Sequence, residues 1–179
     1  MAAIVLRKTN ERITAEEHVR QFLNEQEVLY EHWDTGKLPG ELQEKFILSD
    51  EEKQRILEIF DTEIRALAQR HGYRNWDIVA LSDATPNLDE LLRKFQKVHI
   101  HTEDEVRAIT AGKGIFTIKG AGDTGYFDVE LMPGDVISVP VNIPHFFTLM
   151  ENRRVVAVRL FIDAAGWIAH SYEDPDFQA

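Results

Sequence analysis

The stretch Val98-His99-Ile100-His101-Thr102-Glu103-Asp104-Glu105-Val106-Arg107 lies where the hydrophobic pattern of this chain changes. Upstream of it, apolar residues recur mainly at helical spacing. Downstream of about residue 96, short runs rich in β-branched and aromatic residues alternate with turn-forming residues. These runs cover 115–118, 126–131, 136–139, 146–149 and 155–161. Short strands at this spacing predict a sandwich or a barrel, so we expect a mainly β fold with most of its helices in the N-terminal half.

In this second half of the chain, one segment predicts a turn and another predicts a C-terminal tail. Met132-Pro133-Gly134-Asp135 has Pro at the second and Gly at the third position, as a type II turn requires. The last residues, Glu173 to Ala179, are acidic and contain a proline. We expect them to form a loosely held tail.

The N-terminal half contains three helix-start signals. In each, a Ser, Thr or Asn is followed three positions later by Glu, which is the capping-box pattern. The pairs are Thr14 with Glu17, Ser49 with Glu52, and Asn87 with Glu90. Apolar residues follow each pair at helical spacing, and Gly72 is placed to end the second helix. Residues 28–33, between the first two helices, predict a strand.

The composition is that of one folded domain. The 179 residues are 44% hydrophobic and 28% charged, and 20 Lys and Arg against 31 Asp and Glu give a net charge of −11. An acidic surface repels phosphate backbones, so nucleic acid is not expected as a partner. No apolar run approaches the ~20 residues of a membrane span, and the first residues lack the order of a signal peptide. We therefore expect a cytoplasmic protein with no membrane partner.

The histidine pair His99 and His101 is a candidate metal site. On a strand, residues two apart share a face. Glu105 and Arg107 have the same parity, although a bulge at 102–104 would change their face, and the sequence leaves this open. His145 would have to come from a different strand to complete the site. The alternative is an ordinary pair of surface or core histidines.

The absence of cysteine excludes thiolate ligands, so nitrogen and oxygen would have to hold any metal ion. Three neutral imidazoles and one carboxylate suit a divalent first-row ion such as Fe, Ni, Mn or Co. Such a set fills four positions of an octahedron and leaves two for water or substrate.

Two separate motifs of the chain resemble those of cupins. Four residues match the first cupin motif and three match the second. They are His99, His101, Glu105 and Gly112, followed by Gly134, Pro140 and His145. Three positions depart from the motifs without affecting a ligand: Arg93 and Asn142 replace Gly, and Leu149 replaces Asn. The resemblance implies a small barrel and says little about the reaction.

A closer resemblance, to the bacterial acireductone dioxygenase family of methionine salvage, covers nearly the whole chain. It is carried by residues 94–107, by residues 139–147 and by Gly166-Trp167, and the total length and helical front half agree. The family implies a single cupin domain over 1–179, a double-stranded β-helix or jelly-roll barrel. Within it we expect a mainly helical annex over 1–95, a metal-binding barrel over 96–163 and a C-terminal segment over 164–179.

Residue by residue, the family resemblance implies a ligand set and a pocket. The implied metal ligands are His99, His101, Glu105 and His145. Arg107 and Glu105 are the implied catalytic residues, and the Arg107 guanidinium would hold the anionic enediolate of the substrate. Phe95, Phe147 and Trp167 are the implied walls of the pocket. The alternatives are plain core packing for the aromatic residues and a solvated ion pair for Arg107.

The family reaction is the cleavage of acireductone, 1,2-dihydroxy-3-keto-5-methylthiopentene, by O2 with one Fe2+ or Ni2+ per chain. The iron form gives formate and 2-keto-4-methylthiobutyrate, whereas the nickel form gives formate, carbon monoxide and 3-methylthiopropionate. Two alternatives remain open: a cupin sugar isomerase or epimerase, and a binding module with a structural metal. The chain has no evident self-association motif, so we expect a monomer.

Overall fold

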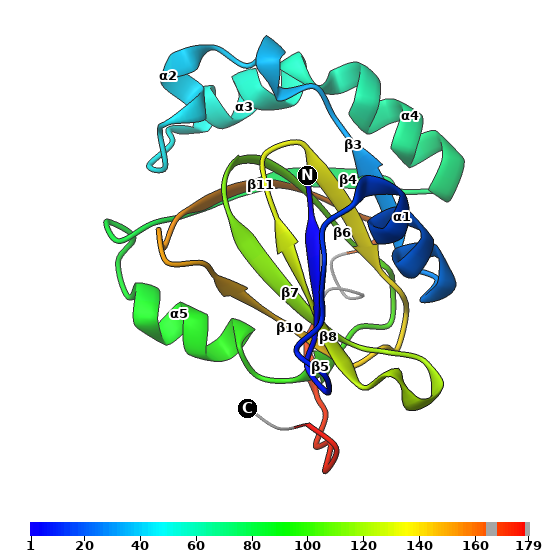
Figure 1. Ribbon diagram of the computed structural model, residues 1–179. Helices are drawn as coiled ribbons and strands as arrows, with labels where there is room; N and C mark the ends of the chain where they lie inside the picture. Colours follow the sequence, from blue (N-terminus) through cyan, green and yellow to red (C-terminus); the bar gives the residue numbers. More distant parts are fainter. Residues whose placement is uncertain (164–167, 178–179) are drawn as a thin grey trace.

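The computed structural model describes residues 1–163 and 168–177, apart from the side chain of Glu105. Two antiparallel sheets form the body of the molecule (Figure 1). The first contains, in spatial order, β12 (His170–Ser171), β5 (His99–Ile100), β10 (His145–Leu149), β7 (Gly114–Lys119), β8 (Tyr126–Leu131), β1 (Ala3–Leu6) and β2 (Arg12–Ile13). The second contains β3 (Leu29–His32), β9 (Asp135–Val139), β6 (Glu105–Gly112), β11 (Val155–Phe161) and β4 (Asn75–Leu81). The prediction of a mainly β fold is confirmed.

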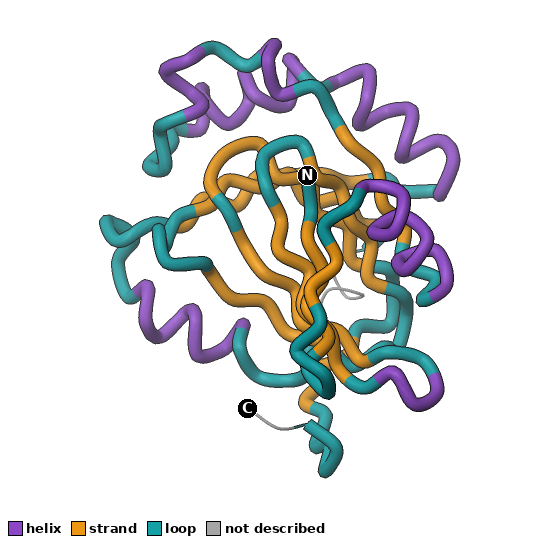
Figure 2. Tube along the Cα trace, viewed as in Figure 1, coloured by secondary structure: helices purple, strands orange, loops and turns teal. Residues whose placement is uncertain are grey.

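The helices lie at the periphery of the two sheets (Figure 2). They are α1 (Glu16–Glu25), α2 (Gly40–Gln43), α3 (Asp50–Ile59), α4 (Asp61–His71) and α5 (Leu88–Phe95), with short 3-10 turns at Thr35–Lys37 and Gly122–Thr124. Helices α2, α3 and α4 cover the outer face of the second sheet (Figure 1). In the part of the chain that the structure describes, no helix is long and apolar enough to cross a lipid bilayer.

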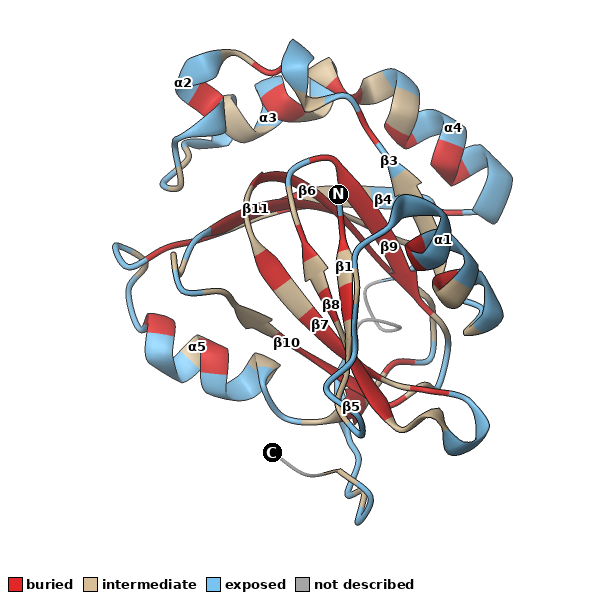
Figure 3. Cartoon of the chain, viewed as in Figure 1, coloured by how far each residue is buried: buried red, intermediate tan, exposed pale blue. Residues whose placement is uncertain are grey.

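Alternation of side chains along the strands separates two apolar clusters. Ile137 and Val139 of β9 point between the sheets, where they meet Phe116 of β7. Val136 points the other way and packs against the helices, together with Phe60. This period of two is the geometry of a strand buried on both faces, and Figure 3 shows β9 buried along its length.

Of the three predicted capping boxes, one forms. The Ser49 hydroxyl accepts from the Glu52 amide at 3.1 Å, and the Glu52 carboxylate accepts from the Ser49 amide at 3.0 Å. The other two predictions are wrong. Ala15, not Thr14, is the N-cap of α1, and Asn87 has the left-handed φ of 58°, whereas a capping side chain needs an extended N-cap.

The predicted long helix that starts at Ser49 is two helices. The chain leaves helical geometry at Phe60, with φ −98° and ψ 14°, and α4 then continues to Gly72. Gly72 ends α4 in the left-handed conformation with φ 78°, as predicted. The break lets the fully buried Phe60 ring stack on Trp33, at 5.4 Å between centroids.

Strands from the first 95 residues, predicted to be a mainly helical annex, take part in both sheets. β1 pairs with β8, β3 pairs with β9, and β4 pairs with β11 along its full length. The strand expected at 28–33 is confirmed as β3, whereas β1 and β4 were not predicted. The annex and the barrel are therefore interleaved in space.

The structure tests the predictions of a turn at 132–135 and of a loosely held C-terminal tail. Gly134 has φ 98° and the Asp135 amide donates to the Met132 carbonyl at 3.0 Å, so the predicted turn is confirmed. The expectation of a loosely held tail is wrong at Asp174, whereas Glu173, Pro175 and Asp176 are exposed. Asp174 accepts hydrogen bonds from Lys119 and from the Tyr126 hydroxyl.

Candidate metal centre

Strands β5 and β10 bring His99 and His145 together. The two residues are direct partners in the antiparallel pairing of these strands, and their ring centroids lie 4.5 Å apart. His99 is 7% exposed and His145 1% exposed. Residues that are widely separated in sequence thus form a buried imidazole pair through one strand register.

His101 completes a group of three. Its ring centroid lies 4.9 Å from that of His99 and 5.2 Å from that of His145, and its side chain is 5% exposed. One ligand nitrogen from each of the three residues lies within 4.8 Å of the others. The structure therefore brings together all three of the predicted histidine ligands.

Two of the imidazoles are oriented by backbone carbonyls. Nδ1 of His99 lies 2.6 Å from the Lys97 carbonyl oxygen, and Nδ1 of His145 lies 2.8 Å from that of Ile143. Because a carbonyl oxygen only accepts, each Nδ1 must carry the proton, which leaves the Nε2 lone pair of a neutral ring for a ligand. Such bonds fix both tautomer and orientation in metal centres, so these residues fit a divalent ion.

The connection after His101 answers the question of a bulge at 102–104. β5 ends at Ile100 in the first sheet, and β6 begins at Glu105 in the second sheet. The chain crosses from one sheet to the other at this point, so residues 102–104 are a connection between two strands and not a bulge within one. His101 follows β5 directly at the start of this crossing, and its ring still lies beside those of His99 and His145.

The residue that replaces a cupin glycine supports this crossing. Asn142 has the left-handed φ of 59°, and its amide donates to the His101 carbonyl at 3.0 Å. Asn is among the few residues with a side chain that adopt this conformation at low cost. The departure from the motif therefore preserves the turn and ties it to a histidine of the site.

Two of the predicted site residues are not fully described. Glu105 begins β6 opposite Val139, but its side chain lies outside the described part of the structure. Trp167 lies outside the described residues altogether. Their places as ligand and pocket wall stay predictions.

Arg107 faces the interior between the sheets. It pairs with Ile137, whose side chain belongs to the inner apolar cluster, and it is 7% exposed. Its guanidinium carbon lies 5.8 Å from the ring centroid of Phe147 and 6.0 Å from that of Phe116. The Phe116 ring in turn lies 6.1 Å from that of His145. The alternative of a solvated surface arginine is excluded by this burial.

Two of the predicted pocket aromatics, Phe147 and Phe95, lie in the described part of the structure, on different elements. Phe147 is 5% exposed on β10 and packs on Phe116, with 5.0 Å between ring centroids. Phe95, at the end of α5, is half-buried against the same inner cluster. Helix α5 is held near β10 by the Gln96 side chain, which donates to the Thr148 hydroxyl at 2.8 Å.

Two residues near Arg107, Phe116 and Arg159, were not predicted from the sequence. Phe116 could have been found from the alternation of the run 115–118, which places it on the inner face. Arg159 lies opposite Arg107 on β11, and its guanidinium binds both carboxylate oxygens of Asp77, at 2.7 and 2.5 Å. No local pattern indicates this second arginine, because its position depends on strand pairing.

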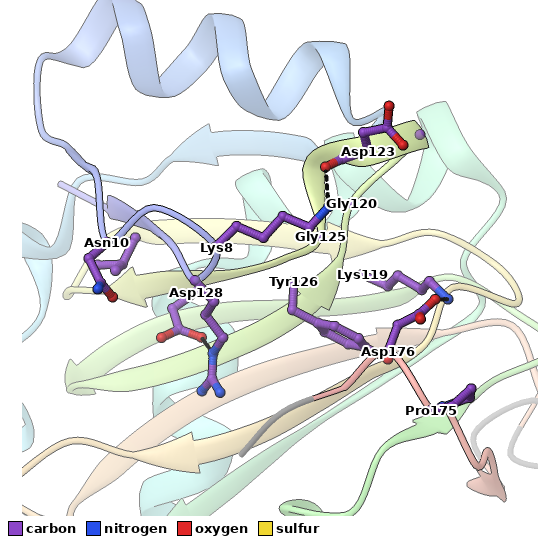
Figure 4. A pocket seen from close by; sticks show the side chains of 13 residues that line it. Lys8, Asn10, Lys119, Gly120, Asp123, Gly125, Tyr126, Asp128, Pro175 and Asp176 are labelled. Atoms are coloured by element: carbon purple, nitrogen blue, oxygen red, sulfur yellow. Dashed lines mark hydrogen bonds and ion pairs between the residues drawn. The ribbon is translucent and has the colours of Figure 1, made fainter.

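A surface pocket of about 780 Å³ lies away from the histidines, on the outer side of the first sheet (Figure 4). It is lined by cations and anions in nearly equal measure. Lys8 donates to the Asp123 carbonyl at 2.7 Å, and Arg7 binds the Asp128 carboxylate at 2.9 Å. Both cations are held by neighbouring groups, and the group of residues that could hold a metal ion lies with the buried histidines.

Two facing antiparallel sheets with a buried histidine triad between them define a metal-binding cupin. Residues 2–169 match the model of the ARD/ARD' family. The chain belongs to this family, the acireductone dioxygenases. It is 68% identical over 176 residues to "Acireductone dioxygenase" of Geobacillus kaustophilus and 66% identical over 176 residues to that of Geobacillus thermodenitrificans, with 98% of each chain covered.

A solved structure has the same fold. It is described as acireductone dioxygenase from Bacillus anthracis with a cadmium ion in its active center. The two chains are 51% identical, with a TM-score of 0.92 and coverage of 95% of this chain and 98% of that one. The predicted family and cupin fold are therefore confirmed.

Proposed function

We propose that this chain is a metal-dependent dioxygenase that cleaves acireductone with O2 in methionine salvage. The observation that carries the proposal is the convergence of His99, His101 and His145, all buried, with ligand nitrogens within 4.8 Å of one another. The names of the relatives and the cadmium in the Bacillus anthracis structure support it. We assign the fourth ligand to Glu105.

The ion that we propose is one Fe2+ or Ni2+ per chain. Imidazole and carboxylate ligands accept both, because neither ion is selected by a thiolate in a chain without cysteine. When bound, the ion would supply a Lewis acid and a template for two substrate oxygens. The carbonyl partners of His99 and His145 would hold their rings ready for it.

We assign Arg107 to the binding of the substrate anion. Acireductone is a 1,2-enediol beside a ketone and is acidic enough to bind as an anion. A buried guanidinium attracts such a charge strongly, because little water competes with it. The rings of Phe116 and Phe147 pack against the planar Arg107 guanidinium and exclude water from the space around it. Phe95 and Trp167 are proposed as further walls of the pocket.

The test is to load one metal-free preparation with Fe2+ or with Ni2+ and to supply acireductone and O2. We expect oxygen uptake with both ions. With iron the products should be formate and 2-keto-4-methylthiobutyrate, and with nickel they should be formate, carbon monoxide and 3-methylthiopropionate. Conversion without oxygen uptake would instead favour an isomerase or epimerase. Identical products with both ions would contradict the metal-dependent part of the proposal. The monomeric state and cytoplasmic location stay predictions.

A further inference from the structure

The C-terminal strap, defined here as residues 168–177, flanks the strand that carries His99. In the pairing of β12 with β5, Ser171 lies opposite His99, and the Tyr172 amide donates to the Val98 carbonyl at 3.2 Å. Strand β5 has two residues, and its other neighbour is β10. The strap thus forms one of the two sides of this short strand, as Figure 1 shows in red beside β5.

Asp174 anchors the strap to the first sheet. Its Oδ2 accepts hydrogen bonds from Lys119 Nζ and from the Tyr126 hydroxyl, both at 2.8 Å. Its side chain is 2% exposed. A shielded carboxylate is tolerated when charged and hydrogen-bonding groups face it, and the Lys119 hydrogen bond lowers the pKa of Asp174. The anchor is therefore an ionised carboxylate at ordinary pH.

The anchor also reaches the strand that carries His145. The Lys119 amide donates to the Pro144 carbonyl at 2.9 Å, immediately before His145. Further along the strap, the Phe177 ring lies 5.2 Å from that of Phe146, which follows His145. The strap therefore binds the backbone next to His99 and packs on the side chain that follows His145, while its partner Lys119 binds the backbone that precedes His145.

We propose that Asp174 is a positioning residue for the metal centre. By holding the strap against β5 and Lys119, it fixes the placement of His99 relative to His145 from outside the ligand set. This inference rests on the proposed metal site. The physical reason is that ligands held in place before the ion arrives lose less freedom on binding, and outer partners of metal ligands influence affinity strongly.

The test compares Asp174→Asn with Asp176→Asn. Both remove one negative charge from the strap, but Asp176 is 81% exposed and lies 3.9 Å from Lys119 Nζ. Figure 4 shows Asp176 beside the end of Lys119. The dissociation constant for Ni2+ should rise about tenfold or more in Asp174→Asn and stay at the wild-type value in Asp176→Asn.

A second measurement uses metal-free protein. Amide hydrogen exchange over residues 98–101 should be faster in Asp174→Asn, by about tenfold, and unchanged in Asp176→Asn. Exchange in β9 and β11 should stay at the wild-type level, because the strap pairs with the first sheet and these strands belong to the second. This readout does not depend on the ion.

The outcomes separate the two proposals. Wild-type exchange and wild-type Ni2+ affinity in Asp174→Asn would overturn the positioning role. Equal acceleration of exchange throughout the chain would also overturn it, since the change would then be general destabilisation. Failure of the wild-type protein to bind metal would contradict the proposed function, while the exchange data would still decide whether Asp174 holds β5.

Discussion

His99 and His145 lie directly opposite each other on antiparallel strands, with 4.5 Å between their ring centroids. This single cross-strand pair sets the distance between two of the proposed ligands. A slip of β5 by one residue would turn the His99 side chain to the opposite face of the sheet. Metal binding in this protein should therefore depend on the register and support of a strand of two residues.

Replacing any one of His99, His101 or His145 by Ala should abolish tight metal binding. Each change removes a ligand nitrogen from the group and leaves too few donors. Metal analysis after dialysis measures the effect. The control is His18→Ala on the exposed face of α1. A full complement of metal in His101→Ala would refute the assignment.

Arg107→Ala should keep the metal and lose substrate binding. Removing the partner of a desolvated charge costs about 2–3 kcal/mol, so KM for acireductone should rise about 30- to 150-fold. Arg107→Lys should recover part of this loss, because an ammonium does not reproduce the planar fork. Steady-state kinetics measure the change, and Arg93→Ala, exposed on α5, is the control. Unchanged kinetics in Arg107→Ala would remove it from the site.

Phe116→Leu should raise KM for acireductone, whereas an equal loss of core packing elsewhere should not. Loss of the aromatic face beside Arg107 is worth about 1 kcal/mol, or about fivefold in KM, and the smaller Leu side chain also lowers stability by leaving a cavity. Phe127→Leu is the matched control. Phe127 is equally buried in the same cluster but packs on Phe22. If both variants changed KM alike, Phe116 would have no particular role.

Acid should weaken the fold partly through Glu52. Hydrogen bonds from Lys45 and from the Ser49 amide lower the pKa of Glu52 from 4.5 to about 2. As pH falls from 4.5 towards 2, the unfolded chain takes up a proton that the folded chain does not, so the free energy of unfolding decreases. In Glu52→Gln this contribution is absent, so Tm should depend less steeply on pH between about 4.5 and 2. Glu51→Gln, a change of the same charge one residue away, should keep the wild-type slope.

Local patterns in the amino-acid sequence determined much of the site. The spacing of His99 and His101, together with the second motif around His145, was enough to name three residues that meet in space. The Ser49–Glu52 cap and the turn at Gly134 were also predicted, because each depends on residues within one turn of chain. The alternation of apolar residues indicated the strands after residue 96 for the same reason.

Features that depend on pairing between distant segments became visible only in the folded chain. Local patterns predicted a β fold and a histidine group, but not that the chain crosses between sheets after His101 or that Arg159 lies opposite Arg107. Nor did it indicate that β4 completes the second sheet or that Asp174 docks on Lys119. Side-chain alternation is a property of a few neighbouring residues, whereas strand order and docking depend on which distant surfaces bury each other most favourably.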